Sequence, residues 1–159
     1  MTTTTEATVR REVTVAAPVE RAFDVFTAGL SSWWPLETHH IGAQPAVEAV
    51  MEPRTGGRYF ERAADGSECD WGFVLAWEPP TRVVFSWHLN ERWEFDPDPE
   101  RASEVEVRFT PEGDSTRVEL EHRGLERHGA GAETIREAVS SEGGWGGLLE
   151  LYKRASEAR

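Results

Sequence analysis

The hydrophobic positions near the C-terminus follow a helical repeat. Trp145, Leu148, Leu149 and Tyr152 are spaced at i, i+3, i+4 and i+7, and charged residues fall mostly between them. Residues on one face of an amphipathic α-helix recur with this spacing. The pattern predicts one long helix over residues 143–158, whose apolar face must be covered by the rest of the chain.

Most of the remaining chain alternates between apolar and polar residues, as half-buried strands do. This alternation predicts strands over residues 9–16, 47–51, 58–62, 70–77, 83–89, 105–109 and 116–122. In the fourth of these, Trp71, Phe73, Leu75 and Trp77 are expected on one face. Tight turns join successive strands, so we expect an antiparallel meander.

Short helices are predicted on either side of this meander. Pro18 suits the first turn of a helix over 19–28, and a second short helix is expected over 30–34. Another helical stretch, over 133–139, precedes the long C-terminal helix. Strands that follow one another, with helices gathered on one face, make the fold class α+β.

Length and composition limit the function classes. The 159 residues suit one domain, and we expect a flexible tail over residues 1–8 and a single domain over 9–159. No apolar run approaches the roughly 20 residues of a membrane helix, and the start lacks a signal-peptide core. The single Cys69 excludes an internal disulfide and a cysteine-based zinc site. We therefore predict a cytoplasmic protein with no membrane partner, no metal and no cofactor.

Charge and aromatic content point to the kind of partner. The formal net charge of −12 repels phosphate backbones, so we expect no nucleic-acid partner. Seven tryptophans in one small domain are unusual. They can fill a core, and they can also line a cavity for a flat apolar ligand.

Several sequence segments, in this order and spacing, resemble one known family. They are APVERAFDVFT at 17–27, Trp33-Trp34, GGRYFE at 56–61, WGFVLAWEPPTRVVFSW at 71–87, TRVELEHRGL at 116–125 and GGW at 143–145. Together they resemble the START-like (SRPBCC) superfamily. Within it, residues 10–157 are similar to bacterial homologues of the C-terminal domain of the heat-shock protein 90 ATPase activator.

The resemblance implies a helix-grip fold, in which a curved antiparallel sheet of about seven strands wraps around the long C-terminal helix. It also implies a cavity between sheet and helix, of the kind that holds lipids, hormones or polyketides in relatives. We expect this ligand to contact Trp34, Arg58, Trp71, Phe73, Trp87, His122, Trp145 and Leu149.

Two of these residues carry polar chemistry. Strand alternation places His122 on the interior face, where it is either a structural histidine tied to a backbone carbonyl or a polar anchor able to transfer a proton. Arg58 is either a solvated charge or, if it faces inward, a partner for a ligand carboxylate. His39 and His40 lie in a polar loop, as solvated side chains or as part of a lid over the cavity.

The chain contains no recognisable catalytic motif, so no residue is assigned a catalytic role. The favoured function is therefore the binding of a small hydrophobic or aromatic molecule. A polyketide cyclase or aromatase, using His122 and Arg58, is the alternative, and a module that binds heat-shock protein 90 is a further one. A homodimer is expected if the strand over 9–16 is a free sheet edge.

Overall fold

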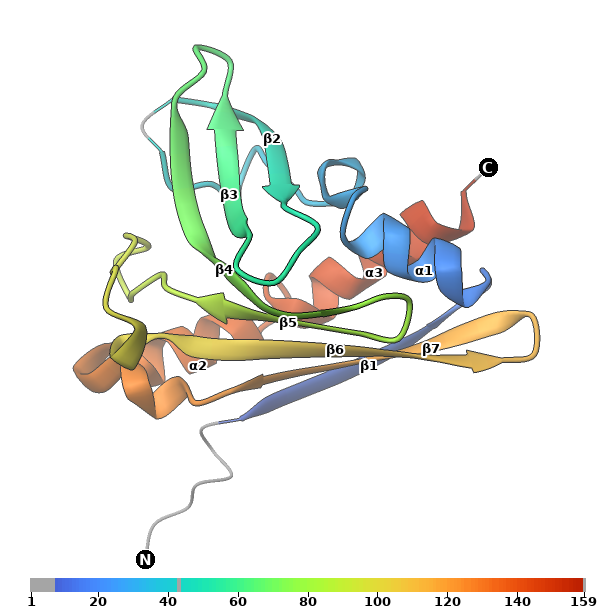
Figure 1. Cartoon of the computed structure of the whole chain (residues 1–159). Coiled ribbons are helices and arrows are strands. Elements are labelled where there is room, and N and C mark those ends of the chain that lie inside the picture. Colours follow the sequence, from blue (N-terminus) through green and yellow to red (C-terminus); the bar gives the residue numbers. More distant parts are fainter. Residues whose placement is uncertain (1–7, 43, 159) are drawn as a thin grey trace, which may run out of the picture.

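The computed structural model describes residues 8–42 and 44–158. Its centre is a seven-stranded antiparallel sheet in the order β1-β7-β6-β5-β4-β3-β2 (Figure 1). The strands are β1 (Val9–Val15), β2 (Ala46–Met51), β3 (Arg58–Ala63), β4 (Glu68–Glu78), β5 (Arg82–Trp87), β6 (Ser103–Glu112) and β7 (Ser115–Arg123). Residues 1–7 of the predicted N-terminal tail lie outside the described residues.

Helices and short 3₁₀ turns connect and cover the strands. They are α1 (Val19–Phe26), η2 (Leu30–Ser32), η3 (Pro99–Arg101), η4 (Leu125–Gly131), α2 (Ala132–Ser140) and α3 (Trp145–Glu157). The expected α+β helix-grip fold is thereby confirmed. No helix among the described residues is long and apolar enough to span a membrane.

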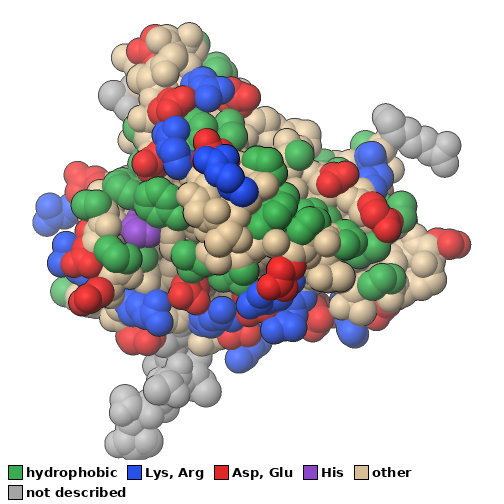
Figure 2. Space-filling model, in the orientation of Figure 1, with side chains coloured by type: hydrophobic (Ala, Val, Ile, Leu, Met, Phe, Trp, Pro, Cys, Tyr) green, Lys and Arg blue, Asp and Glu red, His purple; other side chains and the backbone are tan. Residues whose placement is uncertain are grey.

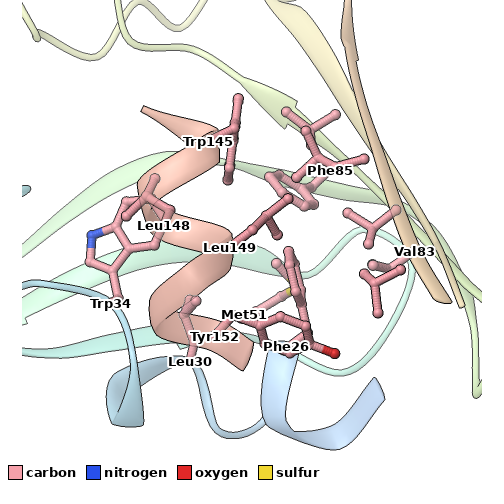
Figure 3. Close-up of a cluster of buried hydrophobic side chains, with 14 of the residues drawn as sticks. Phe26, Leu30, Trp34, Met51, Val83, Phe85, Trp145, Leu148, Leu149 and Tyr152 are labelled. Atoms are coloured by element: carbon pink, nitrogen blue, oxygen red, sulfur yellow. The ribbon is translucent and has the colours of Figure 1, made fainter. Parts of the chain in front are cut away.

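Helix α3 supplies the centre of the core. Trp145, Leu148, Leu149 and Tyr152, the stripe expected from the sequence, are all buried. Figure 3 shows Leu149 pointing toward Phe85 on β5, while Tyr152 lies near the α1 end of the core. The apolar stripe of the helix is therefore covered by the sheet, as the hydrophobic effect requires.

Two β-bulges in β4 overturn the expected alternation along that strand. Trp71 and Leu75 are each an extra residue without a partner in the strand register. As a result Trp71 and Trp77 pack into the interior, whereas Leu75 is exposed and Phe73 is only half-buried. The prediction that all four share one face was wrong, because each bulge shifts the pleat by one residue.

The same bulges help to curve the sheet. In Figure 1, β2, β3 and the upper half of β4 stand at a steep angle to β5, β6, β7 and β1. A bulged strand bends and twists more strongly than a regular one. The bend in β4 separates the β2–β4 layer from α3 at one end, and this is where the cavity described below lies.

The face in Figure 2 carries many intermingled arginine and acidic side chains. Among the described residues, Glu106 on β6 forms ion pairs with Arg82, Arg108 and Arg123. Burial would raise the pKa of Glu106, but hydrogen bonds from Arg123 and Arg82 outweigh it and lower the pKa to about 2. Some of the acidic residues of this chain thus form ion pairs that link neighbouring strands, here β6 with β5 and β7.

Candidate functional site

A cavity of about 410 Å³ lies between the β2–β4 layer and the start of α3. Its walls come from the loop after η2, from β3 and β4, from the end of β5 with the loop that follows, and from the α2–α3 junction. The lining residues are Trp34, Thr38, His39, His40, Ile41, Tyr59, Trp71, Trp87, Leu89, Trp93, Ala138, Val139, Ser141, Gly143, Gly144, Trp145 and Leu148. The volume falls within the range of small-molecule sites, about 300–1,000 Å³.

Five tryptophans form much of this wall: Trp34, Trp71, Trp87, Trp93 and Trp145. Their rings contact one another at tilted or edge-to-face angles, with centroids 5.2 Å apart for Trp34–Trp71 and 5.8 Å apart for Trp87–Trp145. Aromatic rings prefer such offset and edge-to-face contacts. The wall of the cavity is therefore largely aromatic and apolar.

Trp145 is held in place from behind by a chain of hydrogen bonds. Its indole N–H donates to His122 Nδ1 at 3.0 Å, and His122 Nε2 lies 2.8 Å from Ser103 Oγ. Because the indole can only donate, His122 Nδ1 must accept, so His122 Nε2 carries the proton and donates it to Ser103. Ser103 Oγ is then free to donate to His128 Nε2, 2.7 Å away.

His122 is a neutral structural residue in this arrangement. Burial, with a smaller contribution from the neighbouring His128, lowers the pKa of His122 to about 3. Its ring is fully buried and does not line the cavity. The interior position expected from strand alternation is confirmed, but its partners are a serine hydroxyl and an indole instead of a backbone carbonyl.

The loop that precedes β2 closes one side of the cavity. His39 Nε2 donates to the carbonyl of Gly143 at 2.8 Å, and Thr38 Oγ1 donates to His39 Nδ1 at 2.7 Å. The bond to Gly143 joins residues 104 positions apart in the chain. It holds the loop against the α2–α3 junction, so the loop occupies the lid position considered from the sequence.

A buried carboxylate fixes the other end of this loop. Glu61 on β3 accepts hydrogen bonds from the backbone N–H of Ile41 at 2.6 Å and of Gly42 at 3.0 Å, and from Trp71 Nε1 at 2.8 Å. His40 Nδ1 lies 4.0 Å from the second oxygen of Glu61. The loop, a cavity tryptophan and a cavity histidine thus meet at one acidic side chain.

Trp34, Trp71, Trp87 and Trp145, four of the expected ligand contacts, line the cavity. Leu149 points into the core, and Leu148 lines the cavity beside Trp34 (Figure 3). The half-buried Phe73 packs against His88 and Phe95 outside the cavity.

Arg58 is half-buried and does not line the cavity. Its guanidinium is hydrogen-bonded to Asp70 at 2.7 Å and to Glu68 at 2.9 Å, and it lies 4.0 Å from the ring centroid of Phe60. Both acidic partners raise the pKa of Arg58 despite some opposing desolvation, the hydrogen bond to Asp70 contributing most. Arg58 and His122, from which the sequence would build an enzyme, therefore both lie outside the cavity.

Glu61 is not among the residues expected at the site from the sequence, and His40 is expected only as a solvated side chain or part of a lid. Strand alternation could have identified Glu61, because it is two residues from Tyr59 and therefore faces the same interior side of β3. A buried carboxylate on such a face needs partners. Those partners come from a loop, whose path the sequence pattern does not specify.

Chemically, the site offers an apolar aromatic cage with a few polar groups. Among the lining residues, Thr38, Tyr59 and Ser141 bear hydroxyl groups, and His39 and His40 bear imidazoles. Among the described residues, no three His, Cys, Asp or Glu side chains are grouped as a metal site. The arrangement presents aromatic surface together with hydroxyl and imidazole groups, which donate and accept hydrogen bonds.

Residues 16–154 match the family model described as "Activator of Hsp90 ATPase homolog 1-like protein". No curated protein matches the chain.

Solved structures with the same fold include two at substantial identity. The anthrahydroquino-γ-pyrone synthase Txn09 is 41% identical, with 92% of this chain and 95% of that chain covered and a TM-score of 0.66. CalC, a self-sacrificing resistance protein from Micromonospora echinospora, is 30% identical over 95% of this chain and 94% of its own, with a TM-score of 0.70. Protein NE0264 from Nitrosomonas europaea is 13% identical, covers 98% of this chain and 97% of that chain with a TM-score of 0.66, and shares the fold.

Proposed function

We propose that this chain, which belongs to the family of Activator of Hsp90 ATPase homolog 1-like proteins, binds a flat, polycyclic aromatic molecule in its tryptophan-lined cavity. The observation that carries this proposal is the cage of Trp34, Trp71, Trp87, Trp93 and Trp145 around a cavity of about 410 Å³. Indole faces stack on other aromatic rings with little loss of conformational freedom. Hydroxyl and imidazole groups at the loop would orient polar substituents of the ligand.

Similarity to Txn09 supports the ligand class. That protein is a synthase of an anthrahydroquino-γ-pyrone, and its sequence is 41% identical across nearly the whole of both chains. The ligand that we infer here is accordingly a hydroxylated polycyclic molecule of the aromatic polyketide kind.

A second candidate function is ring closure on such a ligand. Two observations favour it: the identity to a pyrone synthase and the imidazole of His40 at the cavity wall. A pyrone ring contains an oxygen bonded to two carbons, so its closure needs a hydroxyl group to lose a proton. A site that binds the ligand and accepts this proton would be an enzyme.

Binding is tested with a cavity-filling substitution on α2. Ala138 lines the cavity, so Ala138→Phe places a ring where we expect the ligand. Glu137→Phe adds the same ring to an exposed position one residue earlier on the same helix and serves as the matched control. We expect a dihydroxyanthraquinone to quench tryptophan fluorescence in the parent chain and in Glu137→Phe. In Ala138→Phe, we expect affinity to fall at least about tenfold, or about 1.4 kcal/mol.

Equal affinities in all three proteins would place the ligand elsewhere and contradict the proposal. Absence of quenching in the parent chain would contradict the ligand class. A partnership with heat-shock protein 90 stays a prediction, which the ATPase rate of that chaperone with and without this chain would test.

A further inference from the structure

We propose that His40 and Glu61 are the proton-transfer pair of the cavity. In this proposal the His40 imidazole accepts a proton from a hydroxyl group of the bound aromatic molecule, and the Glu61 carboxylate stabilises the imidazolium that forms. The inference rests on the proposed function, since it needs an aromatic ligand in the cavity. His40 is then the group that reacts with the ligand, and Glu61 is the group that positions His40.

Glu61 is an ionisable group with a fixed orientation. Its side chain is 3% exposed, and one oxygen accepts from both Ile41 N–H and Trp71 Nε1–H. The other oxygen accepts from Gly42 N–H and faces His40 Nδ1. Donors on both oxygens fix the direction of the carboxylate.

His40 is the side chain that can bring a positive charge to this carboxylate. Three neutral N–H groups bind Glu61, and a cation beside a buried carboxylate adds a direct attraction between opposite charges. His40 supplies one when it takes up a proton. Its Nδ1 is buried, and within the described residues the ring makes no hydrogen bond.

His40 also differs from the other histidines close to the cavity. Both ring nitrogens of His39 are engaged, by Thr38 and by Gly143, and both ring nitrogens of His122 are engaged, by Trp145 and by Ser103. The His40 side chain is 27% exposed and lines the cavity. It can therefore reach a ligand while its Nδ1 side faces the buried acid.

The proton transfer balances without any further reagent. The neutral imidazole takes the proton of a phenolic or enolic hydroxyl, which leaves a negatively charged ligand oxygen beside the Glu61–imidazolium pair. If this oxygen adds to an electrophilic carbon of the same molecule, a carbon–oxygen bond forms and a carbon–carbon π bond breaks. The imidazolium then returns its proton to the carbon that received the electron pair, and the product is an isomer of the ligand.

Alizarin is a suitable probe, because this dihydroxyanthraquinone changes from yellow to red-violet when its phenol ionises. The complex is formed in buffer more acidic than the first pKa of free alizarin, and its visible spectrum is recorded at saturation. We expect the parent chain to bind the phenolate form. In His40→Gln we expect binding to persist and the phenolate band to be lost, because the nearby Glu61 carboxylate disfavours a second negative charge.

Two further variants distinguish the effect of the Glu61 charge on His40 from a general disturbance of the loop. Glu61→Gln keeps the shape of the side chain and removes its charge, so we expect a weaker phenolate band with binding retained. His39→Gln removes a neighbouring imidazole of the same loop that is tied to Thr38 and Gly143. We expect weaker affinity in this matched control but an undiminished phenolate band at saturation. If Glu61→Gln does not fold, the comparison of His40→Gln with His39→Gln decides.

The outcomes distinguish this inference from the proposed function. Fluorescence quenching with a phenolate band that persists in His40→Gln, or with a neutral phenol in the parent chain, overturns the proton-transfer pair and leaves ligand binding intact. Absence of quenching by alizarin in the parent chain overturns both.

Discussion

At the scale of single residues, burial and hydrogen bonding give each histidine around the cavity a different role. His122 is fully buried with both nitrogens engaged, so it supports Trp145 and cannot contact a ligand. His39 is half-buried and joins the loop to Gly143. His40 has an unengaged ring next to a buried carboxylate. The three histidines thus differ in role: His122 supports Trp145, His39 holds the loop in place, and His40 is a candidate base.

The neutral state of His122 predicts a pH dependence of stability. The unfolded chain takes up a proton at His122 below about pH 6.5, whereas the folded chain resists it down to about pH 3. Unfolding therefore binds a proton between these values, and the free energy of unfolding falls as the pH falls, by up to about 1.4 kcal/mol per pH unit. Between about pH 7 and about pH 5 we expect His122 to contribute a loss of about 2 kcal/mol.

Urea unfolding of the parent chain and of His122→Gln at both pH values measures this contribution. Other titrating groups, including carboxylates and His128, contribute to both proteins and largely cancel in the difference. We expect a smaller loss in the variant, although its stability at neutral pH is lower because the Trp145 indole loses a partner. The same loss in both proteins would show that His122 is not neutral in the fold.

At the scale of elements, the start of α3 depends on a close approach of the backbone. A Cβ atom on Gly147 would lie 2.1 Å from the carbonyl oxygen of Glu142, whereas one on Gly146 would meet nothing nearer than 3.9 Å. Both glycines are in the first turn of α3, adjacent to Trp145. One of them is required by packing and the other weakens the helix.

We therefore predict opposite effects for two neighbouring substitutions. Gly146→Ala should raise the free energy of unfolding by about 0.5 kcal/mol, because alanine loses less backbone entropy in a helix. Gly147→Ala should lower it by about 2 kcal/mol or more, because the new methyl group collides with backbone. Thermal and urea unfolding of the two variants measure the difference, and equal effects would contradict the close approach.

At the scale of the whole molecule, side chains cover both edges of the sheet. On β1, Lys153 donates to the carbonyl of Thr14, and Glu157 accepts from the backbone N–H of Ala16. On β2, the hydroxyl of Ser31 both donates to and accepts from the backbone of Ala49. Unpaired edge groups are templates for pairing between chains, and contacts of this kind reduce their availability.

A homodimer through β1 stays a prediction, and it would have to displace these contacts. The double substitution Lys153→Ala with Glu157→Ala frees the edge groups of Thr14 and Ala16. We expect it to shift the monomer–dimer equilibrium several-fold toward the dimer, measured by sedimentation velocity. Glu150→Ala, at an exposed position of α3, is the control. An unchanged equilibrium in the double variant would exclude β1 as the dimer interface.

Local patterns determined the order and type of most elements. The 3.6-residue spacing around Trp145 and Leu149 predicted α3, and alternation around Val118 and Leu120 predicted β7 with His122 inside. These predictions succeeded because the period of a helix or strand depends on neighbouring residues and on one buried side. Trp87 and Trp145, two of the tryptophans expected in the cavity wall, also come from such faces.

Tertiary structure decided what depends on contacts between distant segments. The bulges at Trp71 and Leu75 turned Phe73 away from the cavity, although the strand pattern is regular. The path of the loop brought His40 within 4.0 Å of Glu61, and strand pairing joined Arg58 to Asp70. The amino-acid order by itself therefore determined which faces are buried. The direction of the polar groups depended on how loops and bulges fit once those faces had packed, because their partners lie far away in the chain.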